Sequence, residues 1–327
     1  MKEIAPAIAV TEESAPPAPA ETLSLVIPVY GNEENIADLV PAMEGLNDTL
    51  GGRLEVVFVI DGSPDRSGEL LLAARPGFGF RSRILFHSRN FGSFIAIRTG
   101  LEAATGPYFA VMAADLQEPP ELVAQFFEVL EADEADIVFG TRKSRNDSAV
   151  RDLLSRSFWS VYRRMVMRDV PRGGVDVFAC NRAVRDTVLS IEEPNSSLVA
   201  QLFWIGYRRA FVPYDRQQRV AGKSGWSLAR RFRYLMDSIL SFSDLPILAV
   251  LWIGIFGCLV SLAFAFYVVV ARLMNVIQEP GYTSIILLVA FFGSINMLVQ
   301  GIIGCYLWRT FENSKNRPLS IVSRVVG

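Results

Sequence analysis

The stretch VMAADLQEPPE, from Val111 to Glu121, joins a predicted strand to a predicted helix. The apolar run from Tyr108 to Ala114 predicts a buried strand, which stops at Asp115. The helix starts at Pro119-Pro120, because proline is tolerated in a first helical turn, where its N–H would have no partner. Asp115 and Gln117 therefore follow the carboxyl end of a strand, where open α/β sheets bind their ligands. A polar turn without a function explains this stretch alone equally well.

The composition limits the kinds of site that the chain can hold. Of its 327 residues 51% are hydrophobic, and the excess is concentrated after residue 244. The three cysteines (Cys180, Cys258 and Cys305) have no paired spacing, which argues against disulfides and thiolate metal sites and favours a reducing compartment. The single histidine, His87, excludes a His-rich metal site. Any metal would therefore need oxygen ligands, which favours Mg²⁺ or Mn²⁺ over Zn²⁺.

Strand patterns alternate with helical patterns between residues 23 and 140. We expect strands at Leu23–Tyr30, Leu54–Ile60, Arg83–Ser88, Tyr108–Ala114 and Asp136–Gly140, and helices near 35–46, 66–75, 92–104 and 121–131. Such alternation is typical of βαβ units and a parallel sheet. Polar residues follow each strand, so we expect one crevice at the carboxyl ends. No GxGxxG follows the first strand and no GxxxxGK[ST] occurs, which argues against a Rossmann dinucleotide site and a P-loop.

Two basic segments come next, around a strand predicted at Val175–Cys180 and a helix near 196–206. Residues 142–168 carry eight Lys/Arg against two Asp/Glu, and there Arg151 and Ser155 share a helical face and can clamp a phosphate. A basic solvated face is the alternative, which the count favours. Residues 208–233 carry eight Lys/Arg and one acid around the loop Arg219–Gly225. This loop predicts a mobile cationic lid over a diphosphate or a membrane-surface basic patch.

Residues 245–308 are predicted to form a transmembrane hairpin. The segments Leu245–Ala271 and Pro280–Trp308 carry no charge, and each exceeds the roughly 20 residues that cross a bilayer. Basic residues flank the hairpin, whereas its connector, Arg272–Glu279, is nearly neutral. The positive-inside rule then predicts a multi-pass plasma-membrane protein with its globular domain and both termini in the cytosol.

The remaining segments complete the predicted domain plan. Residues 1–21, rich in Pro, Ala and Glu, predict a disordered tail, and 22–226 the globular domain. Residues 227–244 predict an interfacial amphipathic helix, and 309–327 a cytoplasmic C-terminal tail. Glycines on the spans indicate close helix packing, which allows a homo-oligomer but gives no subunit count. These glycines are Gly254, Gly257, Gly301 and Gly304.

An ordered set of motifs runs from about Leu23 to Ile321. They are SLVIPVYGNEENI, VIDGSPDRS, SRNFG, ADLQEPPE, GTR with an Arg-rich segment, RVAGKSGWS, FSDLP and NRPLSIV. With this set the chain resembles the family 2 glycosyltransferases that act on polyprenyl phosphates, such as dolichol-phosphate mannose synthase and the bacterial undecaprenyl-phosphate glycosyltransferases. The resemblance implies a GT-A-type α/β domain, a UDP- or GDP-linked sugar donor, a divalent metal and inverting chemistry.

The resemblance also implies a role for each residue that matches a family motif. Asp115 and Gln117 match the end of a DxDxQ motif that binds the metal and the donor diphosphate. The implied donor-binding residues are these two with Pro28, Tyr30, Glu33, Asp61, Ser63, Arg219, Lys223 and Ser224. The implied acceptor-phosphate residues are Arg142, Arg151 and Ser155. The implied catalytic residues are Asp115, Arg142 and Lys223.

The chain also departs from the family pattern at several of these positions. Ala113 replaces the first acid of DxD, Ile60 replaces the first acid of DDGS, and Ser93 replaces a common lysine. Gly31-Asn32 also stands where Asn-Glu is common. The change at Ala113 removes a metal or ribose contact and puts metal dependence in doubt. Asp115 with Gln117 can still hold Mg²⁺, which keeps several waters and takes phosphate oxygens from its substrate.

A phosphate acceptor suits a site with so few acids. Its second pKa is near 6, so it is mostly dianionic in the cytosol, whereas a sugar hydroxyl needs a general base. We therefore expect sugar transfer from a nucleotide sugar to polyprenyl (undecaprenyl) phosphate at the bilayer, and no nucleic-acid partner. A membrane-anchored enzyme that elongates a saccharide, or a non-catalytic relative that binds nucleotide sugar or lipid, remains an alternative. No motif specifies the sugar.

Overall fold

The computed structural model describes residues 22–142, 177–193, 196–217, 281–315 and 317–327, with positions 171, 175 and scattered positions from 250 to 274. The chain divides into two compact units, one with the sheet and residues 317–327, the other with residues 231–316. The predicted tail at 1–21 and the predicted interfacial helix at 227–244 lie outside the described residues. So do the predicted site residues Arg151, Ser155, Arg219, Lys223 and Ser224.

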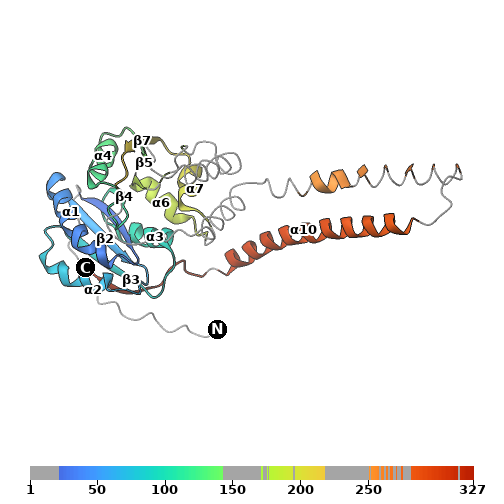
Figure 1. Ribbon diagram of the computed structural model, residues 1–327. Coiled ribbons are helices and arrows are strands. Elements are labelled where there is room, and N and C mark those ends of the chain that lie inside the picture. Colours follow the sequence, from blue (N-terminus) through green and yellow to red (C-terminus); the bar gives the residue numbers. More distant parts are fainter. Residues whose placement is uncertain are drawn as a thin grey trace, which may run out of the picture. The chain divides into compact units, whose positions relative to one another are not determined.

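The described part of the first unit is built on one mixed sheet (Figure 1). Its eight strands lie in the order β7-β5-β6-β4-β1-β2-β3-β8. The strands are β1 (Leu23–Val29), β2 (Leu54–Ile60), β3 (Arg81–His87), β4 (Tyr108–Val111), β5 (Ile137–Arg142), β6 (Phe178–Asn181), β7 (Arg209–Tyr214) and β8 (Val322–Val326). Neighbours β4, β1, β2 and β3 are parallel, and so are β5 and β7. Because β6 is antiparallel to both β4 and β5, all strands except β6 and β8 point the same way. The predicted, mostly parallel α/β fold is confirmed.

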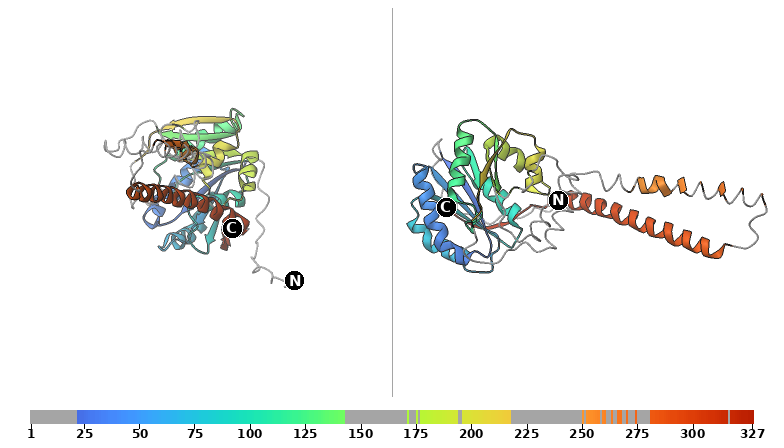
Figure 2. Two further views of the ribbon diagram at one scale, coloured as in Figure 1. Left: turned by 90° about the vertical axis from the view of Figure 1, so that its right-hand side faces the viewer. Right: turned by 45° about the horizontal axis from the view of Figure 1, so that its top comes forward.

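Helices cover both faces of this sheet (Figure 2). They are α1 (Ile36–Thr49), α2 (Ser67–Ala74), α3 (Ser93–Ala103), α4 (Pro120–Glu131), α6 (Arg182–Ser190) and α7 (Leu198–Trp204). Apolar side chains of α1, α2 and α4 share one core with alternate residues of β1 and β2, such as Leu25 and Phe58. On the other face α3 packs closely, because a Cβ on Gly100 would lie 2.2 Å from a methyl of Val26. Alternation along each strand thus supplies two apolar faces for two helical layers.

The strand that leads to Asp115 is shorter than predicted. β4 ends at Val111 rather than Ala114, because β1 pairs with it only through Val111 and β6 only through Ala110. Residues 112–114 continue as a largely buried loop to the turn at Asp115. Helix α4 begins at Pro120, within one residue of the prediction. No predicted helix or strand corresponds to α6, β7 or β8.

The last residues of the chain are part of the sheet, which corrects the predicted tail at 309–327. Strand β8 pairs antiparallel with β3, with Ile84 opposite Val326 and Phe86 opposite Arg324. The Ser88 N–H donates to the carbonyl of Ile321 at 2.9 Å, and the Ser323 hydroxyl donates to the carbonyl of Phe86 at 3.0 Å. The globular domain therefore consists of an N-terminal part and a C-terminal strand, separated in sequence by the apolar region.

The second unit contains one helix that is long and apolar enough to cross a bilayer among the described residues. It is the part Phe291–Phe311 of α10 (Tyr282–Ser314), with a mean hydropathy of 1.3. Most of the first predicted span lies outside the described residues, but positions 252–257 are helical and mostly exposed. A Cβ on Gly257 would lie 3.5 Å from a ring carbon of Phe292, at ordinary van der Waals distance. The second of the two predicted spans thus has a matching helix.

Candidate functional site

The strands that point the same way end at one edge of the sheet, where four of the sequence motifs meet. Tyr30 follows β1, Asp61 follows β2, Asp115 comes after β4, and Arg142 ends β5. Tyr30 is 47% exposed, whereas Asp61 and Asp115 retain 2% and 7% exposure. The sheet topology therefore brings residues from distant motifs to the edge at which we expected the crevice.

Asp65 ties the loop after β1 to the loop after β2. Its Oδ1 accepts from the hydroxyls of Ser63 (2.6 Å) and Ser67 (2.7 Å), and its Oδ2 accepts from the Glu33 N–H (2.9 Å). The Ser63 hydroxyl oxygen in turn accepts from the Gly31 N–H at 2.8 Å. Burial opposes ionisation, but the bonds from Ser63 and Ser67 and from the Glu33 N–H together outweigh it and hold the pKa of Asp65 below 3.8. Ser63 and Glu33, both predicted to bind the donor, thus take part in holding these two loops together.

Asp61 lies beneath the next loop and fixes its backbone. Oδ1 accepts from the Phe91 N–H at 2.8 Å and lies 2.8 Å from His87 Nδ1, while Oδ2 accepts from the Gly92 N–H at 2.8 Å. Burial raises the pKa of Asp61, but the bonds from His87, Phe91 and Gly92 prevail and hold it below 3.8. We predicted a nucleotide contact for Asp61. The bonds to both carboxylate oxygens show that Asp61 positions residues 91 and 92, and the nucleotide contact stays a prediction.

Gly62 brings the loops after β2 and β3 into contact. Its φ of +58° lies in the left-handed region, which favours glycine. A Cβ at this position would lie 2.4 Å from the carbonyl carbon of Arg89 and 2.5 Å from the nitrogen of Asn90. Both atoms belong to the backbone, so they cannot move aside as a side chain would. The loops at 61–63 and 89–92 therefore form one surface at the carboxyl edge.

The turn at Asp115 is held by a second element, the segment after β7. Leu116 has a φ of +52°, and the Gln117 N–H points back to Asp115 Oδ1 at 3.3 Å. The Gln117 carbonyl accepts from the Gln217 N–H at 2.9 Å, and its side-chain oxygen accepts from the Arg216 guanidinium. Arg216 Nε also lies 3.8 Å from the carboxylate of Glu118, whose side chain is 3% exposed. One guanidinium therefore spans Gln117 and Glu118.

These contacts test the predicted metal pair. Asp115 offers a carboxylate, but the side-chain oxygen of Gln117 faces Arg216 rather than an open coordination position. In the described ranges no three His, Cys, Asp or Glu side chains form a metal-binding cluster. Mg²⁺ needs only one or two protein carboxylates when substrate phosphates and waters complete its shell. Asp115 therefore fits as a metal ligand, whereas Gln117, in this arrangement, does not.

Arg142 is the described residue of the predicted acceptor-phosphate set. It is the last residue of β5 and lies in register with Tyr214 of β7. Its side chain is partly buried at the carboxyl edge, at the side of the sheet away from β3. The donor-type motifs after β1 and β2 and this arginine thus lie on different parts of the same edge.

Three residues that organise this edge were not predicted as site residues from the sequence. Asp65 was visible within VIDGSPDRS, and Arg216 within the basic segment, but neither was singled out. His87 was noted only as the single histidine, yet its side chain is buried against Asp61 and Thr99. A signal for His87 existed, because a polar residue in an apolar strand must find a partner when it is buried.

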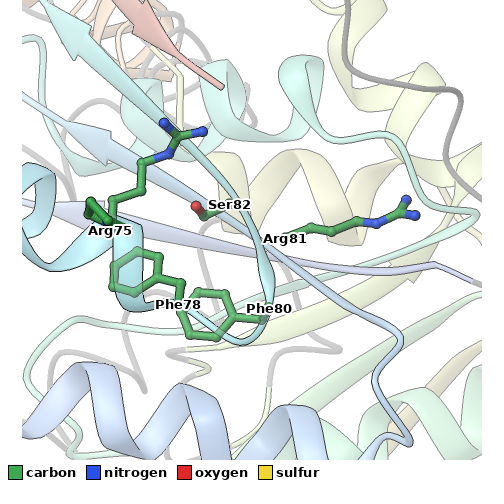
Figure 3. A pocket seen from close by; sticks show the side chains of 6 residues that line it. Arg75, Phe78, Phe80, Arg81 and Ser82 are labelled. Carbon is green, nitrogen blue, oxygen red and sulfur yellow. The ribbon is translucent and has the colours of Figure 1, made fainter.

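A cavity with a volume of about 470 Å³ lies at the opposite end of β3 (Figure 3). It is lined by Arg75, Pro76, Phe78, Phe80, Arg81 and Ser82. Phe78 and Phe80 stack at 4.7 Å, and the side chains of Arg75 and Arg81 point in different directions (Figure 3). Its lining residues come from the start of β3, at the amino-terminal edge of the sheet, so this cavity is separate from the site at the carboxyl ends.

Comparison with known proteins identifies related chains over almost the whole length. The model of glycosyl transferase family 2 matches residues 24–190. An uncharacterized glycosyltransferase of Synechocystis sp. is 32% identical over 93% of this chain and 96% of its own length. A prophage bactoprenol glucosyl transferase homolog of Escherichia coli is 27% identical over 93% of this chain and 99% of its own. The similarity therefore includes the apolar region as well as the sheet.

Solved structures resemble the chain less closely. Glucosyl-3-phosphoglycerate synthase from Mycobacterium tuberculosis, in complex with Mn²⁺, UDP and glucosyl-3-phosphoglycerate, is 16% identical. The similarity covers 68% of this chain and 79% of that one, with a TM-score of 0.48.

Proposed function

Because the chain belongs to glycosyl transferase family 2, we propose that it transfers a sugar from a nucleotide sugar to a polyprenyl phosphate at the cytoplasmic face of the membrane. The observation that carries this proposal is the carboxyl edge of the sheet. It combines the buried carboxylate of Asp115 with the guanidinium groups of Arg216 and Arg142 and with two hydrogen-bonded loops after β1 and β2. The two guanidinium groups would supply positive charge for the phosphates of the two substrates.

The donor would bind over the loops joined by Asp65, with its diphosphate toward Asp115 and Arg216. Tyr30, exposed after β1, and Pro28, near the end of that strand, are the residues proposed to contact the nucleoside. A divalent metal at Asp115 would neutralise charge on the departing diphosphate. The remaining cations predicted for this task, Arg219 and Lys223 with the hydroxyl of Ser224, belong to the segment after Gln217.

The acceptor chemistry explains why few acids suffice. A phosphate oxygen attacks the anomeric carbon, the bond from that carbon to the diphosphate breaks, and the nucleoside diphosphate leaves with the bonding electrons. The phosphate is already dianionic for most of the time at neutral pH, because its second pKa is near 6. No proton has to be removed, so the protein must mainly place the phosphate in line with the leaving group. Arg142, with Arg151 and Ser155, is proposed for that placement.

The apolar region supports a lipid acceptor. The candidate span in α10 would anchor the domain to the bilayer, where the head group of a polyprenyl phosphate lies. Anchoring both in one plane raises the effective concentration of the acceptor at the site. The bactoprenol glucosyl transferase of Shigella phage SfII, 27% identical over 92% of this chain, agrees with this class of acceptor by its name. We also propose the complete hairpin, with the globular domain in the cytosol.

The decisive experiment is mass spectrometry of lipid products. Purified protein is incubated with undecaprenyl phosphate and a panel of UDP- and GDP-sugars, with and without EDTA. We expect one polyprenyl-phosphate sugar from the wild type and none from Asp115→Asn, which keeps the size of the side chain but removes its charge. Undiminished turnover by a folded Asp115→Asn variant would contradict the role of Asp115. Transfer to a soluble glycan in place of the lipid would contradict the acceptor class.

A further inference from the structure

We propose that the segment Arg317–Ile321, which follows α10, positions the loop at residues 88–92 through a chain of four side chains. The chain runs from Ser320 through Thr99 and His87 to Asp61. The inference deepens the proposed function and rests on it, because it makes the C-terminal end of the protein part of the donor site. It also gives a task to the motif NRPLSIV, which the proposed mechanism does not use.

The contacts between these side chains are continuous. Ser320 Oγ lies 2.9 Å from Thr99 Oγ1, which lies 3.0 Å from His87 Nε2. His87 Nδ1 lies 2.8 Å from Asp61 Oδ1. The His87 and Asp61 side chains are 0% and 3% exposed, so water does not compete for these bonds. The four residues come from the C-terminal segment, α3, β3 and the loop after β2.

The number of protons gives Ser320 a specific role. In the proposed relay His87 Nδ1 donates to the Asp61 carboxylate, and His87 Nε2 accepts the proton of the Thr99 hydroxyl. Thr99 has one hydroxyl proton, but its oxygen also lies 3.1 Å from the Ile95 carbonyl, which competes for that proton. A proton donated by Ser320 satisfies the Thr99 oxygen as an acceptor while Thr99 donates to His87. Without Ser320, Thr99 can turn to Ile95 and leave Nε2 unsatisfied.

The same segment also holds the loop directly. The Ser88 N–H, at the start of the loop, donates to the carbonyl of Ile321. At the other end of the loop, Asp61 binds the N–H groups of Phe91 and Gly92. The Phe91 ring meets the His87 ring edge to face at 5.3 Å. The loop therefore has one anchor on the C-terminal segment and one on Asp61, and Gly62, beside the donor site, packs against its backbone.

Two hydroxyl deletions with a matched control test this inference in the full chain. Ser320→Ala and Thr99→Val remove the relay hydroxyls, whereas Ser323→Ala removes a hydroxyl of β8 that donates to the Phe86 carbonyl of β3. We expect the KM for the nucleotide sugar to rise about five-fold in the first two, the effect of losing one hydrogen bond. We expect kcat and the KM for undecaprenyl phosphate to change less than about two-fold in these two variants, because the loss of either hydroxyl alters only the donor site. Ser320→Thr should restore the donor KM, and Ser323→Ala should keep it.

A spectroscopic readout separates positioning from simple stabilisation. His87 is the single histidine of the chain, so a protein labelled with ¹⁵N-histidine and freed of any tag shows only its ring nitrogens. We expect UDP or GDP, whichever the donor contains, to shift these signals in the wild type. We expect Ser320→Ala to move the Nε2 signal and Ser323→Ala to leave it in place.

The possible failures are distinguishable. A wild type that glycosylates undecaprenyl phosphate, together with unchanged donor KM values in folded Ser320→Ala and Thr99→Val, would overturn this inference and leave the proposed function intact. Equal losses for donor and acceptor in all three variants would also overturn it, because they indicate a general effect on folding. A wild type without transfer from any donor would overturn the proposed function, and this inference with it.

Discussion

Replacing Asp61 by asparagine tests whether this carboxylate organises the carboxyl edge of the sheet. The carboxylate accepts from the N–H groups of Phe91 and Gly92 and from His87. The asparagine amide keeps one oxygen as an acceptor, but its NH₂ group replaces the other oxygen and faces an N–H donor of the protein. Losing a hydrogen bond to a charged group costs about 1.5–3 kcal/mol, and a buried unsatisfied N–H costs about 1–3 kcal/mol. Because the two costs overlap, we expect Asp61→Asn to lose about 2–4 kcal/mol of unfolding free energy.

The measurement is urea denaturation of the detergent-solubilised protein, followed by far-UV circular dichroism, with Asp48→Asn as a control. Asp48 is an exposed aspartate of α1, so the same chemical change there should cost less than about 0.5 kcal/mol. A folded pKa below 3.8 means that Asp61 stabilises the protein above its unfolded pKa and loses this effect as the pH falls through its folded value. The stability difference between wild type and Asp61→Asn should therefore shrink below about pH 4. Equal stability of the two proteins at pH 7 would refute the assigned role.

Two further substitutions test the loops and the turn. Gly62→Ala places a Cβ 2.4 Å from the Arg89 backbone at a positive φ. We expect it to lose at least about 2 kcal/mol of unfolding free energy in the same denaturation assay and to bind the nucleotide more weakly by calorimetry. A Gly51→Ala variant, with a positive φ but open space around the Cβ, should lose less unfolding free energy. Arg216→Ala frees Gln117 and Glu118, so we expect the donor KM to rise about ten-fold, as for a lost charged hydrogen bond, and an unchanged KM would contradict the bridging role.

The candidate site could be predicted only in part, because sequence shows which residues follow a strand but not what occupies their polar atoms. Asp115 and Gln117 were expected as a pair of metal ligands. The role of Asp115 stays a prediction, whereas the structure engages Gln117 with Arg216, a residue 99 positions away. Asp61 was expected to contact the nucleotide, and the sequence did not show that it also binds the next loop. Such exchanges depend on which loops the sheet order places side by side.

The sequence by itself determined the local elements and the two-part character of the chain. Alternation of apolar runs and amphipathic segments encodes strands and helices over a few residues, and proline before α4 encodes where that helix begins. Uncharged length encodes a candidate span in the same local way.

Only the tertiary structure decided that the chain ends inside its own sheet. Residues 322–326 form a short edge strand with largely exposed side chains, so they carry no burial pattern that local periodicity could detect. These residues pair with β3, and Ser320 bonds Thr99 across 221 positions, because the chain rejoins the sheet after the apolar region. A contact between such distant residues depends on the folded path of the backbone, which no window of neighbouring residues contains.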